Sequence, residues 1–303
     1  ILDYNLDAIK KIKKIDKTQI ISNKENKNFF IEKGISPFIQ DPIDGTGGAL
    51  KQIYDAKKLS SDYYLVILSD TPIFDYKILN QFINKSISSK TDLSVLSQEI
   101  ANPHGYGRVI MQDKKFLSIV EENDCNVNQK KIKLINTGIF FLSKKAISNI
   151  NLIKKNSQKK EFYITDLIEI SHQKKLKVNA FQNHGLPIQG VNTKPELQDL
   201  EDFYQIYLKE KLIKNGVRII QPDTVYIENN VKISDGVIIE PNVVIKKNVN
   251  IGRETLIKSF SYIEDCNICL LYTSDAADDS LRVDLGGRRI IKKRCSLLLR
   301  VCG

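Results

Sequence analysis

The amino-acid sequence predicts an α/β domain followed by the first coils of a parallel β-helix. The first part of the chain alternates strand-like and helix-like segments, which is the pattern of a sheet packed between helices. Further on, isoleucine recurs at strict intervals of six residues, a period that neither an α-helix nor an ordinary strand sustains. At 303 residues, of which 42% are hydrophobic, the chain has room for two domains with a core each.

The elements of the first domain can be assigned in order. An unbroken apolar run over 63–68 predicts a buried strand, and its neighbours predict helices over 48–59 and 76–88. The pattern also predicts a helix over 164–172 and strands over 38–39, 93–97, 107–111, 116–120, 134–142 and 177–182. We expect this sheet domain to occupy residues 1–194.

A long amphipathic helix follows, over residues 195–216. Pro195 suits the first position of a helix, and Gly216 suits the position just after its end. Its apolar residues follow the three-four spacing of one buried face: Leu197, Leu200, Tyr204, Tyr207, Leu208 and Leu212. We expect it to connect the sheet domain to the β-helix.

The period of six comes from seven isoleucines. They are Ile227, Ile233, Ile239, Ile245, Ile251, Ile257 and Ile263. In a β-solenoid each flat face of a coil contributes one short strand and one inward side chain. Turn-forming pairs such as Asp235-Gly236 separate the inward positions. A β-meander rich in isoleucine is the alternative, but its turns would be spaced irregularly. We assign residues 217–268 to a partial β-helix.

The repeat stops after Ile263. A period of six would place Cys269 and then Asp275 at the next inward positions, and the acidic stretch around Asp275 cannot line a dry core. Residues 269–303 share neither the period nor the composition of what precedes them. We interpret them as a non-native tail resembling a translated sequencing adaptor, with a disordered tail as the alternative. We expect no function from them.

Composition argues against several classes of protein. No apolar run reaches the roughly 18 residues of a membrane span and no secretory signal is evident, so we expect no membrane partner. Only Cys125 of the five cysteines lies in the body of the chain, without metal-ligand spacing, which favours a reducing cytoplasm. The net charge of +10 comes from scattered lysines with acidic residues among them, so we expect no nucleic-acid partner.

Two segments carry candidate chemistry. Gly45, Gly47 and Gly48 open a helix, where backbone N–H groups can approach a ligand at the positive end of the helix dipole; a tight turn is the alternative. Asp70 follows the strand over 63–68. A carboxylate at the carboxyl end of a parallel strand points into the crevice that binds ligands, and its oxygens suit Mg²⁺. Helix N-capping is the alternative for Asp70.

The order of seven short segments resembles a known family, the sugar-nucleotide pyrophosphorylases. The segments are D-G-T-G-G-A, L-S-D-T-P, G-Y-G-R, I-V-E-E, I-N-T-G, E-F-Y-I-T-D and G-V-N. Within that family the chain looks most similar to the bacterial bifunctional N-acetylglucosamine-1-phosphate uridyltransferase/glucosamine-1-phosphate acetyltransferases. The resemblance covers residues 1 to about 268. It implies a Rossmann-like nucleotidyltransferase sheet and a left-handed β-helix.

The resemblance also implies an activity and a site. The activity is formation of UDP-N-acetylglucosamine and pyrophosphate from UTP and N-acetylglucosamine 1-phosphate, with Mg²⁺ as the cofactor. Asp70 and Asn192 would hold Mg²⁺. The implied substrate contacts are Gln40, Gly45 and Thr46 around the uracil, Leu68, Ser69 and Asp70 after the strand, and Gly107, Glu121 and Asn136 toward the sugar. Asn192 is implied as a further substrate contact. A neutral acetylated sugar calls for short polar groups, and such transfers rely on positioning, so no catalytic side chain is expected.

The chain departs from the family at both ends. Family members open with a strand and an L-A-A-G-x-G-T-R-M loop, which this sequence does not contain, and most of the β-helix with the acetyl-CoA site is also lacking. We therefore expect a protein truncated at both ends, with little or no uridyltransferase activity and no acetyl transfer, and we expect the full-length protein to be a homotrimer. The alternatives are another sugar-1-phosphate nucleotidyltransferase, or a non-catalytic fragment or scaffold.

Overall fold

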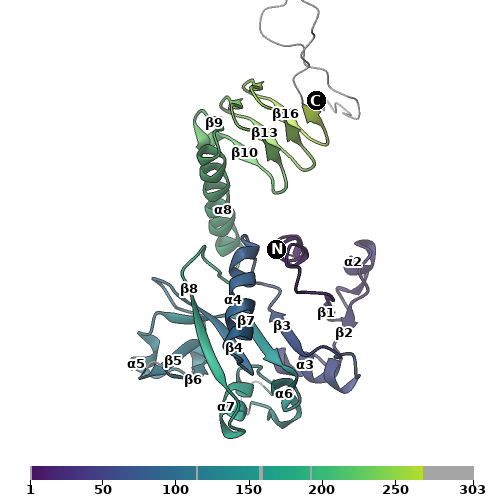
Figure 1. Cartoon of the computed structure of the whole chain (residues 1–303), viewed down its shortest axis with the longest axis vertical. Coiled ribbons are helices and arrows are strands. Elements are labelled where there is room, and N and C mark those ends of the chain that lie inside the picture. Colours follow the sequence, from purple (N-terminus) through teal and green to yellow (C-terminus); the bar gives the residue numbers. More distant parts are fainter. Residues whose placement is uncertain (1, 114, 157–159, 192, 269–303) are drawn as a thin grey trace, which may run out of the picture. The chain divides into compact units, whose positions relative to one another are not determined.

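The chain forms two compact units, Ile1–Asn192 and Thr193–Gly303. The computed structural model describes residues 2–113, 115–156, 160–191 and 193–268. The first unit is an α/β sheet unit and the second is built from short parallel strands (Figure 1), which confirms the predicted fold class. No helix among the described residues combines the length and the apolar character needed to cross a membrane.

The first unit contains seven α-helices, eight strands and two 3-10 turns within its described residues. The helices are α1 Leu2–Lys10, α2 Lys27–Glu32, α3 Gly45–Asp55, α4 Tyr76–Ser88, α5 Val127–Lys130, α6 Lys144–Ile147 and α7 Asp166–Gln173. The strands are β1 Ile21–Ser22, β2 Phe38–Ile39, β3 Tyr63–Ile67, β4 Leu93–Glu99, β5 Arg108–Gln112, β6 Lys115–Val120, β7 Leu134–Ser143 and β8 Val178–Asn183. The 3-10 turns are η1 Glu122–Asp124 and η2 Ile150–Leu152.

A mixed sheet lies at the centre of the first unit. Its order is β6-β5-β7-β4-β8, and β3 also pairs with β7. Strand β7 is antiparallel to β3, β4 and β5, whereas β4 and β8 are parallel. The strand expected over 63–68 was predicted to be parallel and fully buried, and this is wrong. Among the described residues β3 pairs only with β7, and Tyr63 is 44% exposed because it lies at the end of that pairing.

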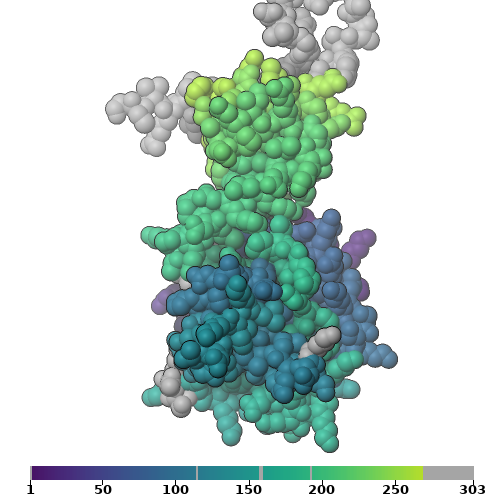
Figure 2. All heavy atoms as spheres, turned by 90° about the vertical axis from the view of Figure 1, so that its left-hand side faces the viewer, coloured from purple at the N-terminus to yellow at the C-terminus, as the bar shows by residue number. Residues whose placement is uncertain are grey.

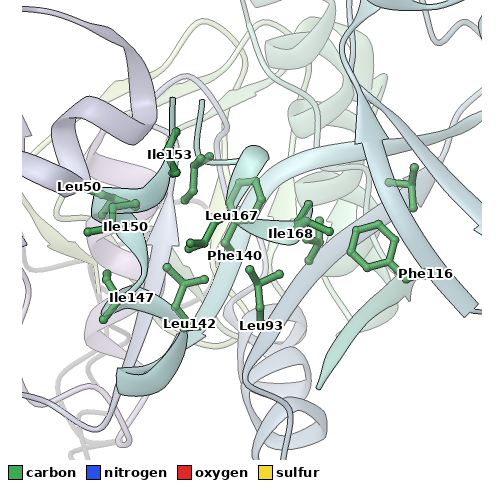
Figure 3. Packing of buried hydrophobic residues seen from close by; sticks show 14 residues of the cluster. Leu50, Leu93, Phe116, Phe140, Leu142, Ile147, Ile150, Ile153, Leu167 and Ile168 are labelled. Atoms are coloured by element: carbon green, nitrogen blue, oxygen red, sulfur yellow. The ribbon is translucent and has the colours of Figure 1, made fainter. Parts of the chain in front are cut away.

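Two cores cover the two faces of this sheet, because alternate residues of a strand point to opposite sides. Phe140 and Leu142 of β7 pack with α3, α6 and α7 (Figure 3). Ile139 and Phe141 of the same strand pack instead with α1 and α4. Fully burying one such side chain contributes roughly 1.5–3 kcal/mol, so this alternation explains why β7 is apolar almost throughout.

The expected elements of the first unit are present with shifted ends. The most informative shift is in the helix expected over 48–59, which begins at Gly45, so the glycine-rich segment forms its first turn. Elements α1, β1 and α2 were not predicted, since their short segments carry no long periodic pattern.

The second unit begins with a helix and continues as very short strands. The elements are α8 Lys194–Lys214, β9 Arg218–Ile219, η3 Pro222–Thr224, β10 Tyr226–Ile227, β11 Lys232–Ile233, β12 Ile238–Ile239, β13 Val244–Ile245, β14 Asn250–Ile251, β15 Leu256–Ile257, β16 Tyr262–Ile263 and β17 Asn267–Ile268.

These strands form three parallel sheets of three strands each within the described residues. Ile227 lies opposite Ile245, and Ile245 lies opposite Ile263, so equivalent residues meet one coil apart. The first two of these isoleucines are fully buried in a core that also contains Ile239 and Ile251. Successive coils stack directly on one another, and the colours of Figure 2 pass from green to yellow along this stack. The predicted period of six is therefore confirmed up to Ile263.

The position predicted after Ile263 is wrong. Ile268, and not Cys269, lies opposite Ile251, so this interval has five residues. The turn after Ile263 is one residue shorter than the turn after Ile245, and the buried Cys266 takes the place of Val249 one coil earlier. Residues 269–303, where we predicted a non-native tail, lie outside the described residues.

Helix α8 caps the first coil through polar side chains. Among the strands of the described residues, β10 pairs with β13 on one side and with none on the other. On its other side Gln205 donates to the Ile227 carbonyl at 2.8 Å and accepts from the Ile227 N–H at 3.1 Å, as a neighbouring strand would. The Lys209 ammonium donates to the carbonyls of Pro222 and Val225 at 2.6 and 3.1 Å, and burial lowers the pKa of Lys209. The predicted connector thus belongs to the second unit and satisfies its edge.

Candidate functional site

The predicted site residues of the first unit fall into three groups that touch one another. We call them the Gly45 turn (residues 40–48), the Asp70 loop (residues 68–71) and the Gly107 cluster (Gly107, Glu121 and Asn136). Each group lies at the end of a strand or the start of a helix: after β2, after β3, and where β5, β6 and β7 meet.

The glycines of the Gly45 turn allow close packing against the segment before α7. Gly45 has φ +91°, and a Cβ there would lie 2.6 Å from the Phe162 carbonyl oxygen. The Gly47 N–H donates to that same oxygen at 2.8 Å. A Cβ on Gly48 would meet the Asp44 carboxylate. We predicted that these amides face a ligand; the Gly47 amide instead bonds within the protein, because the helix starts three residues earlier than expected.

Gln40 and Thr46 hold this turn in shape. The Gln40 side-chain amide donates to Asp44 Oδ1 and to the Gly45 carbonyl, both at 3.1 Å. Thr46 Oγ1 accepts from the Ile164 N–H at 3.3 Å. The structure therefore brings Gln40, Gly45 and Thr46 together and ties them to the E-F-Y-I-T-D segment.

The Asp70 loop is held from both sides. The Leu68 N–H donates to the Gly138 carbonyl at 3.2 Å, and the Val191 N–H donates to the Asp70 carbonyl at 2.9 Å. Asp70 Oδ1 accepts from Thr71 Oγ1 at 3.1 Å. The Asp70 side chain is half-buried, whereas Ser69 is exposed. These bonds fix the backbone that carries the Asp70 carboxylate.

A buried asparagine of α1 supports the Asp70 loop from below. Asn5 is 6% exposed. Its Nδ2 donates to the Thr71 carbonyl at 3.0 Å, and its Oδ1 accepts from the Ile73 N–H at 2.8 Å. Asn5 was not among the residues predicted from the sequence. The only signal is one amide side chain on a helix face that otherwise packs apolar residues such as Ala8.

The Gly107 cluster gathers the residue before β5, the residue after β6 and one residue of β7. A Cβ on Gly107 would lie 2.9 Å from Ile119 Cγ2 and 3.3 Å from Glu121 Oε2, so only glycine lets the carboxylate come this close. The Asn136 N–H donates to the Gly107 carbonyl at 2.9 Å. The three residues that the sequence assigned to one subsite therefore lie side by side.

A bulge in β7 joins this cluster to the Asp70 loop. Ser97 of β4 pairs with Asn136, but Leu96 pairs with Ile139, so β7 has two extra residues there. One of them is Gly138, with φ +76°, whose N–H donates to Asn136 Oδ1 at 3.0 Å. A Cβ on Gly138 would lie 2.9 Å from Leu68 Cδ1. Asn136 and the Asp70 loop are therefore neighbours.

Thr165 joins the Gly107 cluster to the Gly45 turn. Its hydroxyl donates to Glu121 Oε1 at 3.2 Å, and it directly follows Ile164, whose N–H donates to Thr46 of the Gly45 turn. The sequence singled out the E-F-Y-I-T-D segment without giving Thr165 a role. The contact joins residues 44 positions apart, which no local pattern encodes.

A buried ion pair supports the loop before Gly107. Arg108 is 1% exposed; its Nη2 donates to Glu122 Oε2 at 2.6 Å and its Nη1 donates to the Tyr106 carbonyl. The Gly105 N–H donates to the same Glu122 oxygen at 3.1 Å. Burial alone would raise the pKa of Glu122, but these hydrogen bonds outweigh it and hold the pKa below its ordinary value.

The donor set at Asp70 fits one kind of magnesium site. Among the described residues no group of three or more His, Cys, Asp or Glu side chains could hold a metal ion, which argues against a closed protein cage. Mg²⁺ commonly takes one or two protein ligands together with water and phosphate oxygens, and the half-buried Asp70 carboxylate suits that arrangement. The other predicted ligand, Asn192, lies outside the described residues, although its neighbour Val191 bonds to Asp70.

Two family models match the chain. The nucleotidyl transferase model matches residues 1–186, and the bacterial transferase hexapeptide model, with six repeats, matches residues 224–265. The chain is also similar in fold to a solved structure from Bacillus anthracis described as a glucose-1-phosphate thymidylyltransferase. The TM-score is 0.55 at 23% identity, over 67% of this chain and 81% of that one. At this identity the likeness concerns the fold alone.

Several curated proteins named bifunctional protein GlmU are similar in sequence. The identity is 31% to the one from Thermosipho melanesiensis, over 77% of this chain and 47% of the relative. It is 34% to the one from Clostridioides difficile, over 74% and 49%, and 35% to the one from Campylobacter fetus, over 78% and 53%. The chain thus spans about half the length of the curated relatives it matches.

Proposed function

The chain belongs to the nucleotidyl transferase family, and on that premise we propose that it transfers a uridylyl group from UTP to N-acetylglucosamine 1-phosphate. The products are UDP-N-acetylglucosamine and pyrophosphate. The observation that carries this proposal is that Gly138 joins the Asp70 loop to the Gly107 cluster: its carbonyl accepts from the Leu68 N–H, and its N–H donates to Asn136 Oδ1. A metal-binding and a sugar-binding group must be neighbours if one ligand, a sugar joined to a phosphate, is to reach both.

The Gly107 cluster suits a neutral, acetylated sugar. It offers one carboxylate (Glu121), one side-chain amide (Asn136) and a backbone that a glycine leaves open to close approach. Sugar hydroxyls donate well to a carboxylate, and an acetamide pairs well with amide and backbone groups. Side chains that bind hydroxyl and amide groups discriminate strongly against analogues that lack them. We therefore assign this cluster to the N-acetylglucosamine moiety.

The Gly45 turn would hold the nucleotide base. Gln40 and Thr46 are polar, half-buried and held in place by the bonds to Gly45 and Ile164. Preorganised side chains lose little entropy when a ligand binds. We assign Gln40, Gly45 and Thr46 to the uracil, and Leu68 and Ser69 to the part of the nucleotide next to Asp70.

The reaction needs positioning more than a nucleophilic side chain. An oxygen of the sugar phosphate attacks the α-phosphorus of UTP, a new P–O bond forms, and the bond from that phosphorus to the bridging oxygen breaks as pyrophosphate leaves. Asp70, together with Asn192, would hold Mg²⁺, which when bound neutralises charge on the phosphate oxygens. The remaining residues hold the two substrates in line. Our assignment concerns the first unit, and no acetyl transfer is assigned to the described residues.

We place this reaction in the cytoplasm and favour UTP and a sugar phosphate as the only partners of the first unit. The described cysteines, Cys125 and Cys266, are free and buried, which is in keeping with a reducing compartment. We propose trimer formation only for proteins of the relatives' full length, with the contacts made by the region that corresponds to the second unit.

The test measures ligand affinity, since binding reports on the site whether or not turnover follows. Calorimetric titration of the chain with UDP-N-acetylglucosamine and with UDP-glucose, with and without Mg²⁺, should give at least about a tenfold preference for the acetylated sugar. Replacing Glu121 by Gln removes one charge without changing shape. We expect it to weaken binding of UDP-N-acetylglucosamine about tenfold or more, as loss of a charged hydrogen bond does.

The matched control is Glu169→Gln, which makes the same change at an exposed position of α7 and should leave affinity unchanged. Equal affinity for the two nucleotide sugars, or no binding of either, would overturn the assignment. Release of pyrophosphate from UTP with each sugar phosphate provides a second measure of the same preference.

A further inference from the structure

Tyr106 links the Gly107 cluster to the Asp70 loop by a route separate from the contact through Gly138 and Leu68. It lies next to Gly107, and its hydroxyl donates at 3.1 Å to the carbonyl of Gly190, across 84 residues of sequence. Gly190 in turn adjoins the Asp70 loop, because a Cβ on it would lie 3.8 Å from Asp70 Oδ2 and the following Val191 N–H donates to the Asp70 carbonyl.

The near end of this link is firmly held. Arg108 donates to the Tyr106 carbonyl, and its partner Glu122 accepts from the Gly105 N–H, so the backbone on both sides of Tyr106 is tied to one buried ion pair. Few water molecules can compete for the hydrogen bonds of Arg108, because its side chain is 1% exposed. Because its backbone is held, Tyr106 can fix the position of the Gly190 carbonyl to which its hydroxyl donates.

The far end of the link is a backbone carbonyl. Gly190 has no side chain, and the next residue, Val191, donates its N–H to the Asp70 carbonyl. Removing the Tyr106 hydroxyl would therefore remove the bond to Gly190 and leave the bond between Val191 and Asp70 in place.

We propose that Tyr106 is a positioning residue that holds the Gly107 cluster and the Asp70 loop at a set separation through its bond to Gly190. The role of this separation in ligand binding rests on the proposed function. A ligand that reaches both groups, such as UDP-N-acetylglucosamine, then depends on Tyr106. A ligand that contacts the nucleotide side alone, such as UTP, does not.

The test is Tyr106→Phe, which keeps the ring and removes only the hydroxyl. The dissociation constant for UDP-N-acetylglucosamine should rise about three- to tenfold, the usual effect of one neutral hydrogen bond. The constant for UTP should change less than about twofold. A general loss of structure would weaken both ligands together, so the difference between them separates positioning from folding.

The matched control is Tyr204→Phe, which removes a hydroxyl whose 2.9 Å bond to Asn229 lies in the second unit. It should leave both affinities unchanged. In the protein without ligand, amide hydrogen exchange at Val191 should speed up in Tyr106→Phe and stay unchanged in Tyr204→Phe, because only the first variant releases the segment next to Asp70.

The outcomes separate the two proposals. If the unaltered chain binds UDP-N-acetylglucosamine and Tyr106→Phe binds it equally well, the role of Tyr106 is overturned and the proposed function stands. If the unaltered chain binds no nucleotide sugar, the proposed function fails, and exchange at Val191 decides whether Tyr106 holds the two groups. Unchanged exchange in Tyr106→Phe would overturn that role as well.

Discussion

The two units of this protein are specified by the chain in different ways. In the second unit a residue meets its equivalent one coil away, as Ile227 meets Ile245, and the same relation repeats along the stack. In the first unit the decisive contacts join unrelated positions, such as Thr46 with Ile164 across 118 residues and Thr71 with Asn5 across 66. One coil of the second unit can therefore unfold while the next stays folded. The site of the first unit, in contrast, depends on many distant contacts at once.

This difference has a practical meaning for substitutions. In the second unit the effect of a change should depend on burial alone and should stay in that unit. In the first unit it should depend on what the altered residue touches elsewhere in the chain. Three substitutions test this contrast.

The largest effect is expected for Ile245→Ala in the middle coil. This side chain is fully buried, so truncation should cost the second unit about 2–5 kcal/mol of unfolding free energy. Ile206→Ala on α8 makes the same change at a residue that is 52% exposed and should cost much less. Hydrogen exchange under increasing denaturant reports on each unit separately. An equal loss of protection in the first unit would show that the two units unfold together, and the contrast would be broken.

A somewhat smaller effect is expected for Gly45→Ala in the first unit. Gly34 provides the control, since both glycines have positive φ but a Cβ on Gly34 would meet nothing within 4 Å. Gly34→Ala should cost about 1 kcal/mol from backbone strain alone. Gly45→Ala should cost about 2–3 kcal/mol, because the new Cβ also collides with the Phe162 carbonyl. If chemical denaturation gave equal losses of unfolding free energy for the two variants, the segment before α7 would have moved away from the new Cβ at no cost.

The smallest effect concerns pH and Glu122. Because its folded pKa lies below the ordinary value of 4.5, its ion pair stabilises the folded state above that pH, and this contribution is lost as pH falls through the folded pKa. Glu122→Gln should remove about 1 kcal/mol or less of this acid dependence from the first unit. Denaturation of both proteins between pH 7 and about 3 measures it. Glu32→Gln, at an exposed position of α2, is the control, and an identical pH profile for Glu122→Gln would contradict the prediction.

The same contrast explains what the sequence could predict. The period of six gave the strands of the second unit almost residue by residue, because repetition makes one rule serve every coil. It failed at Ile268, where a turn loses one residue and the rule no longer applies. In the first unit the order of strands and helices followed from apolar patterns. The pairing of β3 with β7 did not, since a buried run looks the same in a parallel and an antiparallel sheet.

The candidate site was predictable as a set of residues and not as a set of contacts. Gly107, Glu121 and Asn136 were assigned to one subsite through the resemblance, and they do lie together. The packing of Gly45 against another segment, and the support that Asn5 gives to the Asp70 loop, could not be inferred from the sequence. Each depends on a partner far along the chain. The assigned ligand roles remain predictions that the experiments above test.

Because α8 caps the first coil, the number of coils in the stack does not depend on the contacts of the helix. Gln205 bonds to the free backbone groups of Ile227, and Lys209 bonds to the carbonyls of Pro222 and Val225, so side chains of α8 cover this part of the first coil. Coils could then be added or deleted at the opposite end in multiples of a full turn without any compensating change near the helix. A protein engineer could use this start as a ready-made nucleus for shorter or longer helical stacks.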